Sequence, residues 1–167
     1  MILLAEQDPS VNATFTIPGG NRNLKIIAQV ATTDASVGQV QLLMQCNGDT
    51  GANYDSNYVT VSGTTVGTPV QTLGGTAMQI GFIPGTNIAG NYSSPNVITI
   101  FDYARTAWYK AATGLSGWDN NNAANTPGMS MHSGYWLNTA VITSLTFGIN
   151  YSGAVFTAGS LISIYGE

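Results

Sequence analysis

Residues 39–48 read QVQLLMQCNG, an alternation of polar and apolar side chains that ends in an Asn-Gly pair. In an extended chain, every second side chain points to the same face. The apolar residues that share such a face here are Val40, Leu42, Met44 and Cys46. Asn-Gly favours a tight turn because both residues accept the left-handed backbone. The stretch therefore predicts a β-strand with one face on a core, closed by a turn.

The same period of two recurs along the chain and predicts about nine strands. They are expected over residues 11–17, 24–31, 39–46, 58–62, 77–83, 97–103, 129–137, 143–149 and 161–165. Turn-forming residues separate them, as in PGGN at 18–21 and Pro127-Gly128. We therefore expect an all-β chain, a jelly-roll-like antiparallel β-sandwich that forms a single domain over residues 1–167.

Two segments lack this clear period. Residues 103–113, YARTAWYKAAT, contain helix-forming residues, but adjacent Trp108 and Tyr109 break a helical stripe. We therefore favour a strand plus a connection over a helix. Residues 119–125, DNNNAAN, are expected to form a loop. Both chain ends are expected to be structured, with the first strand beginning near Val11, as in a complete small module.

Charged side chains are scarce: four Lys/Arg and eight Asp/Glu, or 7% of the chain, against roughly 25% in an ordinary soluble domain. A net charge of −4 with four cations offers no basic patch, which argues against nucleic acid and anionic membranes as partners. No apolar run approaches the roughly 20 residues of a membrane-spanning helix. One cysteine and one histidine make neither an internal disulfide nor a zinc site, so no cofactor is expected.

One loop carries oxygen-bearing side chains at short intervals. Asp49-Thr50-Gly51 matches the catalytic turn of aspartic proteases, but that chemistry needs two carboxylates that share a proton. Four side chains of the loop could instead supply oxygen atoms to calcium: Asn47, Asp49, Asn53 and Asp55. We favour a turn in which Asp49 and Asp55 accept hydrogen bonds from backbone amides, and calcium is the alternative.

No set of residues points to an enzyme. His132 is the only imidazole, and alternation places it opposite Met129, Met131 and Tyr135, so we expect it to face outward or to lie at a subunit contact. No nucleophile elbow precedes a helix, and no carboxylates are paired for glycoside cleavage. Cys46 continues an apolar face, which favours a buried thiol over a nucleophile. We therefore expect no catalytic residues.

Aromatic side chains are the last candidate set: Trp108, Trp118, Trp136, Tyr92, Tyr109 and Tyr135. Exposed aromatic faces bind the apolar faces of sugar rings. Large aromatic residues also fill cores and oligomer interfaces, and in a small sandwich we favour that role. The candidates for a ligand site or a subunit interface are Trp108, Trp118, Trp136, Tyr135 and His132.

Several stretches carry a resemblance that covers most of the chain. They are LLMQCNGDTGANYDSNY (42–58), IPGTNIA (83–89), ITIFDYARTAWYK (98–110), the turn LSGWD (115–119), and 135–166, which begins YWLNTAVITSLTFG and ends FTAGSLISIYG. Together they resemble a group of small β-sandwich virion proteins of tailed bacteriophages. Cys46 stands where that group has an aromatic residue before Asn-Gly-Asp.

The resemblance implies a virion structural protein and no catalytic residues. We expect a capsid decoration (cement) protein that forms a homo-oligomer, a trimer being the natural guess, and binds the major capsid protein. The alternative is a tail or fibre module, bound to tail proteins, that recognises host surface glycan. Either would assemble in the host cytoplasm and remain on the particle. The scarcity of Lys supports association, because charged residues normally protect unpaired strand edges.

Overall fold

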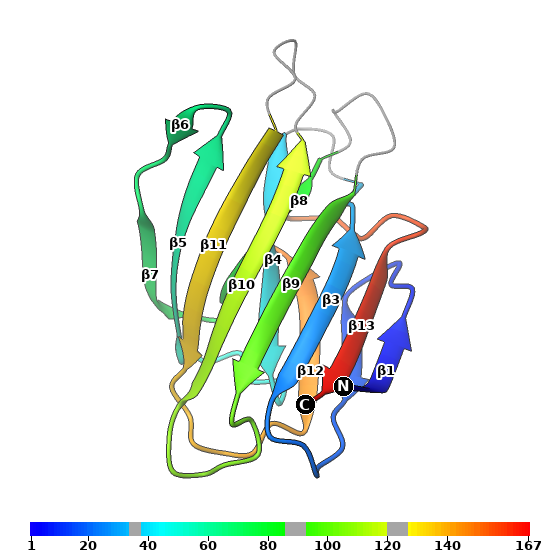
Figure 1. The fold of residues 1–167 in the computed structure, drawn as a ribbon, viewed down its shortest axis with the longest axis vertical. Helices are drawn as coiled ribbons and strands as arrows, with labels where there is room; N and C mark the ends of the chain where they lie inside the picture. The colour runs from blue at the N-terminus through cyan, green and yellow to red at the C-terminus, as the bar shows by residue number, and fades with distance from the viewer. Residues whose placement is uncertain (34–37, 86–92, 120–126) are drawn as a thin grey trace.

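Two antiparallel sheets face each other in the computed structural model, which describes residues 1–33, 38–85, 93–119 and 127–167 (Figure 1). The larger sheet contains, in spatial order, β1 (Ile2–Gln7), β13 (Leu161–Gly166), β3 (Leu24–Val30), β9 (Ser94–Phe101), β10 (Lys110–Asp119), β11 (Pro127–Trp136), β5 (Tyr54–Ser62) and β6 (Thr65–Val66), and β7 (Val70–Gly75) also pairs with β5. The smaller sheet contains β2 (Ala13–Thr16), β12 (Ser144–Ile149), β4 (Gln39–Cys46) and β8 (Met78–Pro84).

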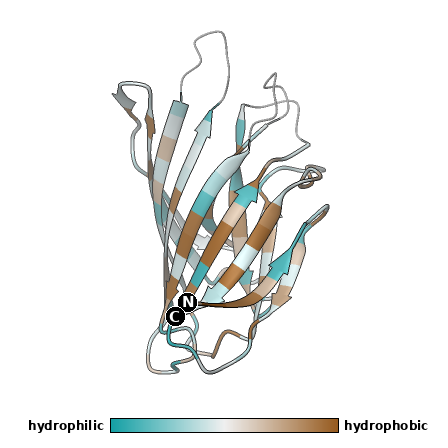
Figure 2. Ribbon diagram, turned by 45° about the vertical axis from the view of Figure 1, so that its right-hand side comes forward, coloured by the Kyte–Doolittle hydropathy of each residue, from teal (hydrophilic) through white to brown (hydrophobic). Residues whose placement is uncertain are grey.

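The core lies between the two sheets and follows from the alternation of side chains. β3 and β4 bury every second residue, and β12 adds Leu145 and Phe147. Phe147 meets Phe15 edge to face, with the ring centroids 5.7 Å apart. Hydrophobic bands cross successive strands in Figure 2. Each fully buried aliphatic or aromatic side chain contributes about 1.5–3 kcal/mol, so this alternation supplies most of the driving force for folding.

The antiparallel all-β sandwich predicted from the period of two is confirmed. The strand expected over 39–46 begins and ends at those residues as β4. The turn after it is confirmed too, because Asn47 and Gly48 have φ angles of 54° and 66°, in the left-handed region. Both chain ends lie at the same end of the sandwich, as Figure 1 shows.

Three segments differ from expectation. The first strand, β1, begins at Ile2 and not near Val11. A turn is expected over residues 115–119, but these residues continue the regular strand β10. Leu115 points outward and Trp118 points inward, as alternation along a strand requires. The sequence pattern misses β7, whose residues are mostly exposed and show no alternation. Residues 103–113 form a connection followed by the start of β10, as favoured, and no helix.

Some expectations fall outside the described residues. They concern the loop over 120–125, residues 86–89 and Tyr92. Among the residues that the structure describes, no helix is long and apolar enough to cross a membrane.

Candidate functional site

The strand β11 carries apolar side chains outward and polar side chains inward. Met129, Met131 and Tyr135 are exposed, with Met131 at 62%, whereas Ser130 and His132 are buried against the small sheet. A strand with one face on a core normally does the opposite, with its polar face toward water. The outer side of β11 therefore has the character of a surface that another molecule covers.

Its neighbours β10 and β9 also expose apolar side chains, although both bury apolar residues as well, among them Trp118 and Ile98. β10 exposes Leu115 at 47% and buries Ser116, while β9 exposes Val97 and Phe101 and buries Asn96. β8 is the strand of the small sheet that packs against the inner side of these strands. Three adjacent strands thus turn apolar side chains to the outside at the centre of the large sheet.

The strand register aligns these side chains into a continuous row, here called the apolar row. It crosses five strands from β3 to β5 and consists of Ile27, Val97, Leu115, Met131 and Val59. Neighbours in such a row lie on strands about 4.8 Å apart, so their side chains contact one another. Met129 and Val61 lie in the next outward-facing row on one side of the apolar row. Phe101 and Tyr135 lie two rows away on its other side.

We call the outward side of β3, β9, β10, β11 and β5 the outer face. Among the described residues that point outward from these strands, three are charged: Lys25, Asp55 and Asp119. Lys25 and Asp55 lie on the two marginal strands, and Asp119 ends β10. The centre of the outer face therefore contains apolar and small polar side chains but no charge.

A hollow of about 540 Å³ lies on the outer face over Gly114. It is bounded by the apolar row on one side and by small polar residues on the other: Asn57, Thr99, Thr113 and Ser133. This hollow can accept a protruding apolar side chain of a partner, since its walls contain both aliphatic carbon and hydroxyl groups.

His132 lies in the interior of the sandwich, only 4% exposed, so the expectation that it faces outward is wrong. Its Nε2 lies 2.7 Å from Ser130 Oγ, which lies 2.6 Å from Ser116 Oγ. The imidazole stacks on Tyr58 with the ring centroids 5.2 Å apart. Burial lowers the pKa of His132 to about 4, so the ring is neutral at neutral pH. His132 is thus part of a buried polar layer.

This layer does not form a catalytic triad among the described residues. His132 Nδ1 has no hydrogen-bond partner there, whereas a Ser-His-Asp triad places a carboxylate at that atom. Ser130 is 1% exposed, so no substrate reaches its hydroxyl in this conformation. Cys46 is buried as expected, and burial raises the pKa of its thiol to about 12, which keeps it protonated and unreactive.

The Asp-Thr-Gly loop has a structural role. Asp49 accepts hydrogen bonds from the Gly51 backbone N–H (2.8 Å), from Asn53 Nδ2 (3.0 Å) and from Trp136 Nε1 (2.7 Å). These donors, the Trp136 indole above all, hold the pKa of Asp49 below its usual value. Asp55 Oδ1 accepts from the Gly74 N–H at 2.9 Å. The favoured prediction, that both aspartates bond backbone amides, is confirmed.

The same contacts engage the oxygens that calcium would need. Asn47 Oδ1 accepts from the backbone N–H groups of Thr143 (2.8 Å) and Ser144 (3.1 Å). A cation at Asn47, Asp49 and Asp55 would have to displace these N–H donors. Within the described part of the chain, no group of three or more His, Cys, Asp and Glu side chains is placed to hold a metal ion.

The three tryptophans are not brought together into one platform. Trp118 (5% exposed) and Trp136 (1% exposed) are core residues at opposite ends of the β10–β11 pair. Trp118 packs on Phe82 with the ring centroids 5.1 Å apart. The core role favoured for these two residues is confirmed. Trp108 and Tyr135 remain at the surface, 70% and 50% exposed.

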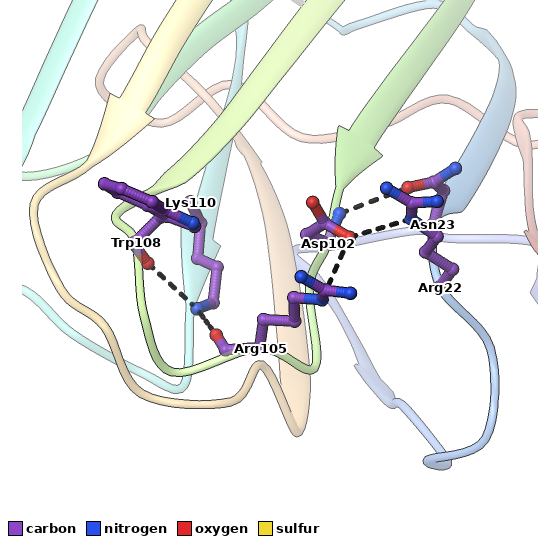
Figure 3. Close-up of polar contacts among 6 residues, drawn as sticks. All are labelled: Arg22, Asn23, Asp102, Arg105, Trp108 and Lys110. Atoms are coloured by element: carbon purple, nitrogen blue, oxygen red, sulfur yellow. Dashed lines mark hydrogen bonds and ion pairs between the residues drawn. The ribbon is translucent and has the colours of Figure 1, made fainter.

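The sequence alone does not predict a charged cluster that lies at one end of the sandwich. Asp102 Oδ1 lies 3.0 Å from Arg22 Nε and 3.6 Å from Arg105 Nε (Figure 3). Nearby, the buried Lys110 donates from Nζ to the carbonyl groups of Arg105, Thr139 and Trp108. Arg22 and Asp102 are 80 residues apart, so only the pairing of β3 with β9 reveals that they meet.

Comparison of the chain with known protein families, with curated proteins and with solved structures finds no match in any of the three. The two regions of the structure that bear on function are therefore the outer face and the charged end of the sandwich.

Proposed function

We propose that this protein is a structural component of a bacteriophage virion, a capsid decoration (cement) protein. It forms a homo-oligomer, with a trimer as the stoichiometry, and binds the major capsid protein to stabilise the shell without chemistry. The observation that carries the proposal is the set of apolar side chains that β9, β10 and β11 expose side by side on the outer face. The sequence resemblance to small phage sandwich proteins supports the particle as its place.

The outer face has a suitable size for a specific interface. Five strands about 4.8 Å apart and four rows about 7 Å apart cover, with side-chain margins, roughly 600 Å². A standard protein–protein interface takes roughly 800 Å² from each partner. The outer face thus provides most of one half of such an interface, and its apolar centre provides the hydrophobic core that interfaces require.

A second copy of the chain is the occupant that the charges favour. An uncharged centre does not repel itself, whereas a face with net charge would. The margins carry opposite charges, Lys25 on β3 and Asp55 on β5. Neighbouring copies in an oligomer can therefore bring Lys25 of one copy close to Asp55 of the next. The scarcity of charge in the whole sequence, 7%, fits a chain whose surface is largely covered in an assembly.

Particle reconstruction tests this proposal. A decoration protein should occupy the capsid surface in hundreds of copies arranged by the icosahedral symmetry. Particles stripped of it should lose resistance to heat. A count of about a dozen copies, confined to the tail axis, would overturn the decoration role.

A glycan-binding tail module is the second candidate, and one observation favours it. Trp108 and Tyr109, 70% and 56% exposed, stand side by side in the connection between β9 and β10. Exposed adjacent aromatic residues at the end of a sandwich are typical of sugar contact. Host adsorption of particles that carry Trp108→Ala tests it, because adsorption unchanged from wild type would reject a sugar-binding role for this end.

A further inference from the structure

We propose that the charged end of the sandwich binds a carboxylated sugar, held by Arg22 and Arg105, with Trp108 exposed further along the connection that contains Arg105. This site lies in the connections at the strand ends, away from the centre of the outer face (Figure 3). Binding here does not require self-assembly, and it rests on the second candidate function, sugar recognition at the connection between β9 and β10.

The first observation is where the chain places its few cations. The whole sequence contains four Lys/Arg residues. Three of them, Arg22, Arg105 and Lys110, meet around the connection between β9 and β10, although the strands β3 to β9 separate Arg22 from Arg105 in sequence. In a chain with so little charge, this concentration creates the one end where a guanidinium pair is available to an anion.

The second observation is that the two arginines keep their binding ends free. Both use Nε toward the same oxygen, Asp102 Oδ1, and among the described residues their terminal Nη atoms make no hydrogen bond. Two guanidinium groups against one carboxylate leave an excess of positive charge, which favours an anion. The planar fork of N–H donors matches the two oxygens of a carboxylate.

A hollow of about 370 Å³ lies between these groups. It is lined by Gly20, Asn21, Arg22, Asp102, Ala104 and Arg105. Its walls come from two connections that are far apart in sequence and that meet at this end of the sandwich. The space is open to a ligand that approaches from solvent, since both arginine side chains are more than half exposed.

The third observation is that buried groups hold both connections in place. Lys110, 1% exposed, fixes the backbone at Arg105 and Trp108 through their carbonyl oxygens. Tyr103, fully buried, donates a hydrogen bond from its hydroxyl to the Pro18 carbonyl at 2.7 Å. This bond joins the connection between β9 and β10 to the connection between β2 and β3. Asp102 adopts a φ of 46°, uncommon for a residue with a side chain. Such preorganisation lowers the entropy cost of binding.

The fourth observation favours a sugar over other carriers of a carboxylate. Trp108 and Tyr109 lie exposed in the same connection as Arg105, outside the hollow itself. Aromatic faces pack against the C–H groups of sugar rings, while charged donors fix the ring through its polar substituents.

Titration of the purified protein with sialyllactose, glucuronic acid and neutral lactose tests the proposal, followed by the indole N–H signals in NMR spectra. We expect an acidic sugar to bind at least about tenfold more tightly than lactose and to shift the Trp108 signal. Arg105→Gln and Arg22→Gln should each weaken binding by about tenfold or more, and Trp108→Ala should also weaken it. Lys25→Gln, a cation outside this cluster, serves as the matched control and should bind as wild type does.

Three results would overturn the proposal. One is the absence of binding by either acidic sugar at millimolar concentration. Another is binding that Arg105→Gln leaves unchanged, with the fold of the variant verified by thermal unfolding. The third is equal binding of an acidic peptide that does not depend on Trp108, which would assign the site to a protein carboxylate. None of these results bears on self-assembly, which Arg22→Gln and Arg105→Gln should leave intact.

Discussion

At the scale of single residues, Asp49 shows how a motif with a catalytic look serves the fold. The sequence alone predicts that its carboxylate closes a turn, because Asp in a Gly-rich loop bonds nearby amides. The sequence could not predict the indole of Trp136 as its strongest partner, since 87 residues separate the two and only the β11–β5 pairing brings them together. Local chemistry was readable from the sequence, and the long-range partner was not.

We predict that Trp136→Phe destabilises the protein more than Trp118→Phe. Both substitutions remove the same atoms from a buried site, but only Trp136 donates to a carboxylate, at 2.7 Å. A hydrogen bond to a charged group contributes about 1.5–3 kcal/mol, so the difference in the free energy of unfolding should be about 2 kcal/mol. Urea denaturation of the two variants measures it, and equal losses would contradict this role of Asp49.

The contact between Asp49 and Trp136 should also weaken in acid. The folded state lowers the pKa of Asp49, so its stabilising effect is present above the unfolded value of 3.8 and is lost as pH falls through the lower folded value. The difference between Trp136→Phe and Trp118→Phe should therefore shrink at the lowest pH at which the protein remains folded.

We also predict that His132 makes the free energy of unfolding depend on pH. Its pKa is about 6.5 when unfolded and about 4 when folded, so between these values the unfolded chain binds more protons. The free energy of unfolding should fall by about 3 kcal/mol as pH decreases from 7 to 4 on this account alone. Denaturant unfolding across this pH range measures it. In His132→Gln this part of the slope should disappear, and a slope equal to wild type would show that other groups cause the acid sensitivity.

At the scale of elements, alternation predicts where strands run but not which side of a strand is inside. β11 follows the predicted period, with His132 opposite Met131 as expected, yet the polar side is the buried one. The usual rule assigns apolar side chains to the core, and on β11 Met129, Met131 and Tyr135 depart from it. The second half of β10 is not predicted as a strand because Gly114, Ser116 and Gly117 are residues that otherwise mark turns.

We predict that Gly114→Ala disturbs the packing of β10 on β8. A Cβ at this position would lie 2.3 Å from the Ile80 carbonyl oxygen, which belongs to backbone and cannot rotate away. Overpacking of this kind costs about 1–3 kcal/mol. Gly19→Ala is the control, because nothing lies within 4 Å of the added carbon. Thermal unfolding of both variants checks the prediction, and a Gly114→Ala variant as stable as Gly19→Ala would contradict the close contact of the two sheets.

At the scale of the whole molecule, the scarcity of charge and the exposed apolar side chains of the central strands both indicate association. The sequence indicates association through its scarcity of Lys and Arg, but it could not locate the surface, because that requires the register of five strands. The structure places the apolar row at the centre of the large sheet and the charges at its margins. An exposed apolar patch with charges at its margins is typical of a surface that a partner covers.

Sedimentation of the purified protein over a wide range of concentration tests this central claim most directly. The wild type should form a discrete oligomer. Leu115→Lys, which places a charge in the apolar row, should sediment as a monomer with an unchanged fold. Thr16→Lys, an equal charge on the exposed side of β2 in the small sheet, should assemble as wild type does. A wild type that stays monomeric throughout, or a Leu115→Lys variant that assembles equally well, would contradict the account.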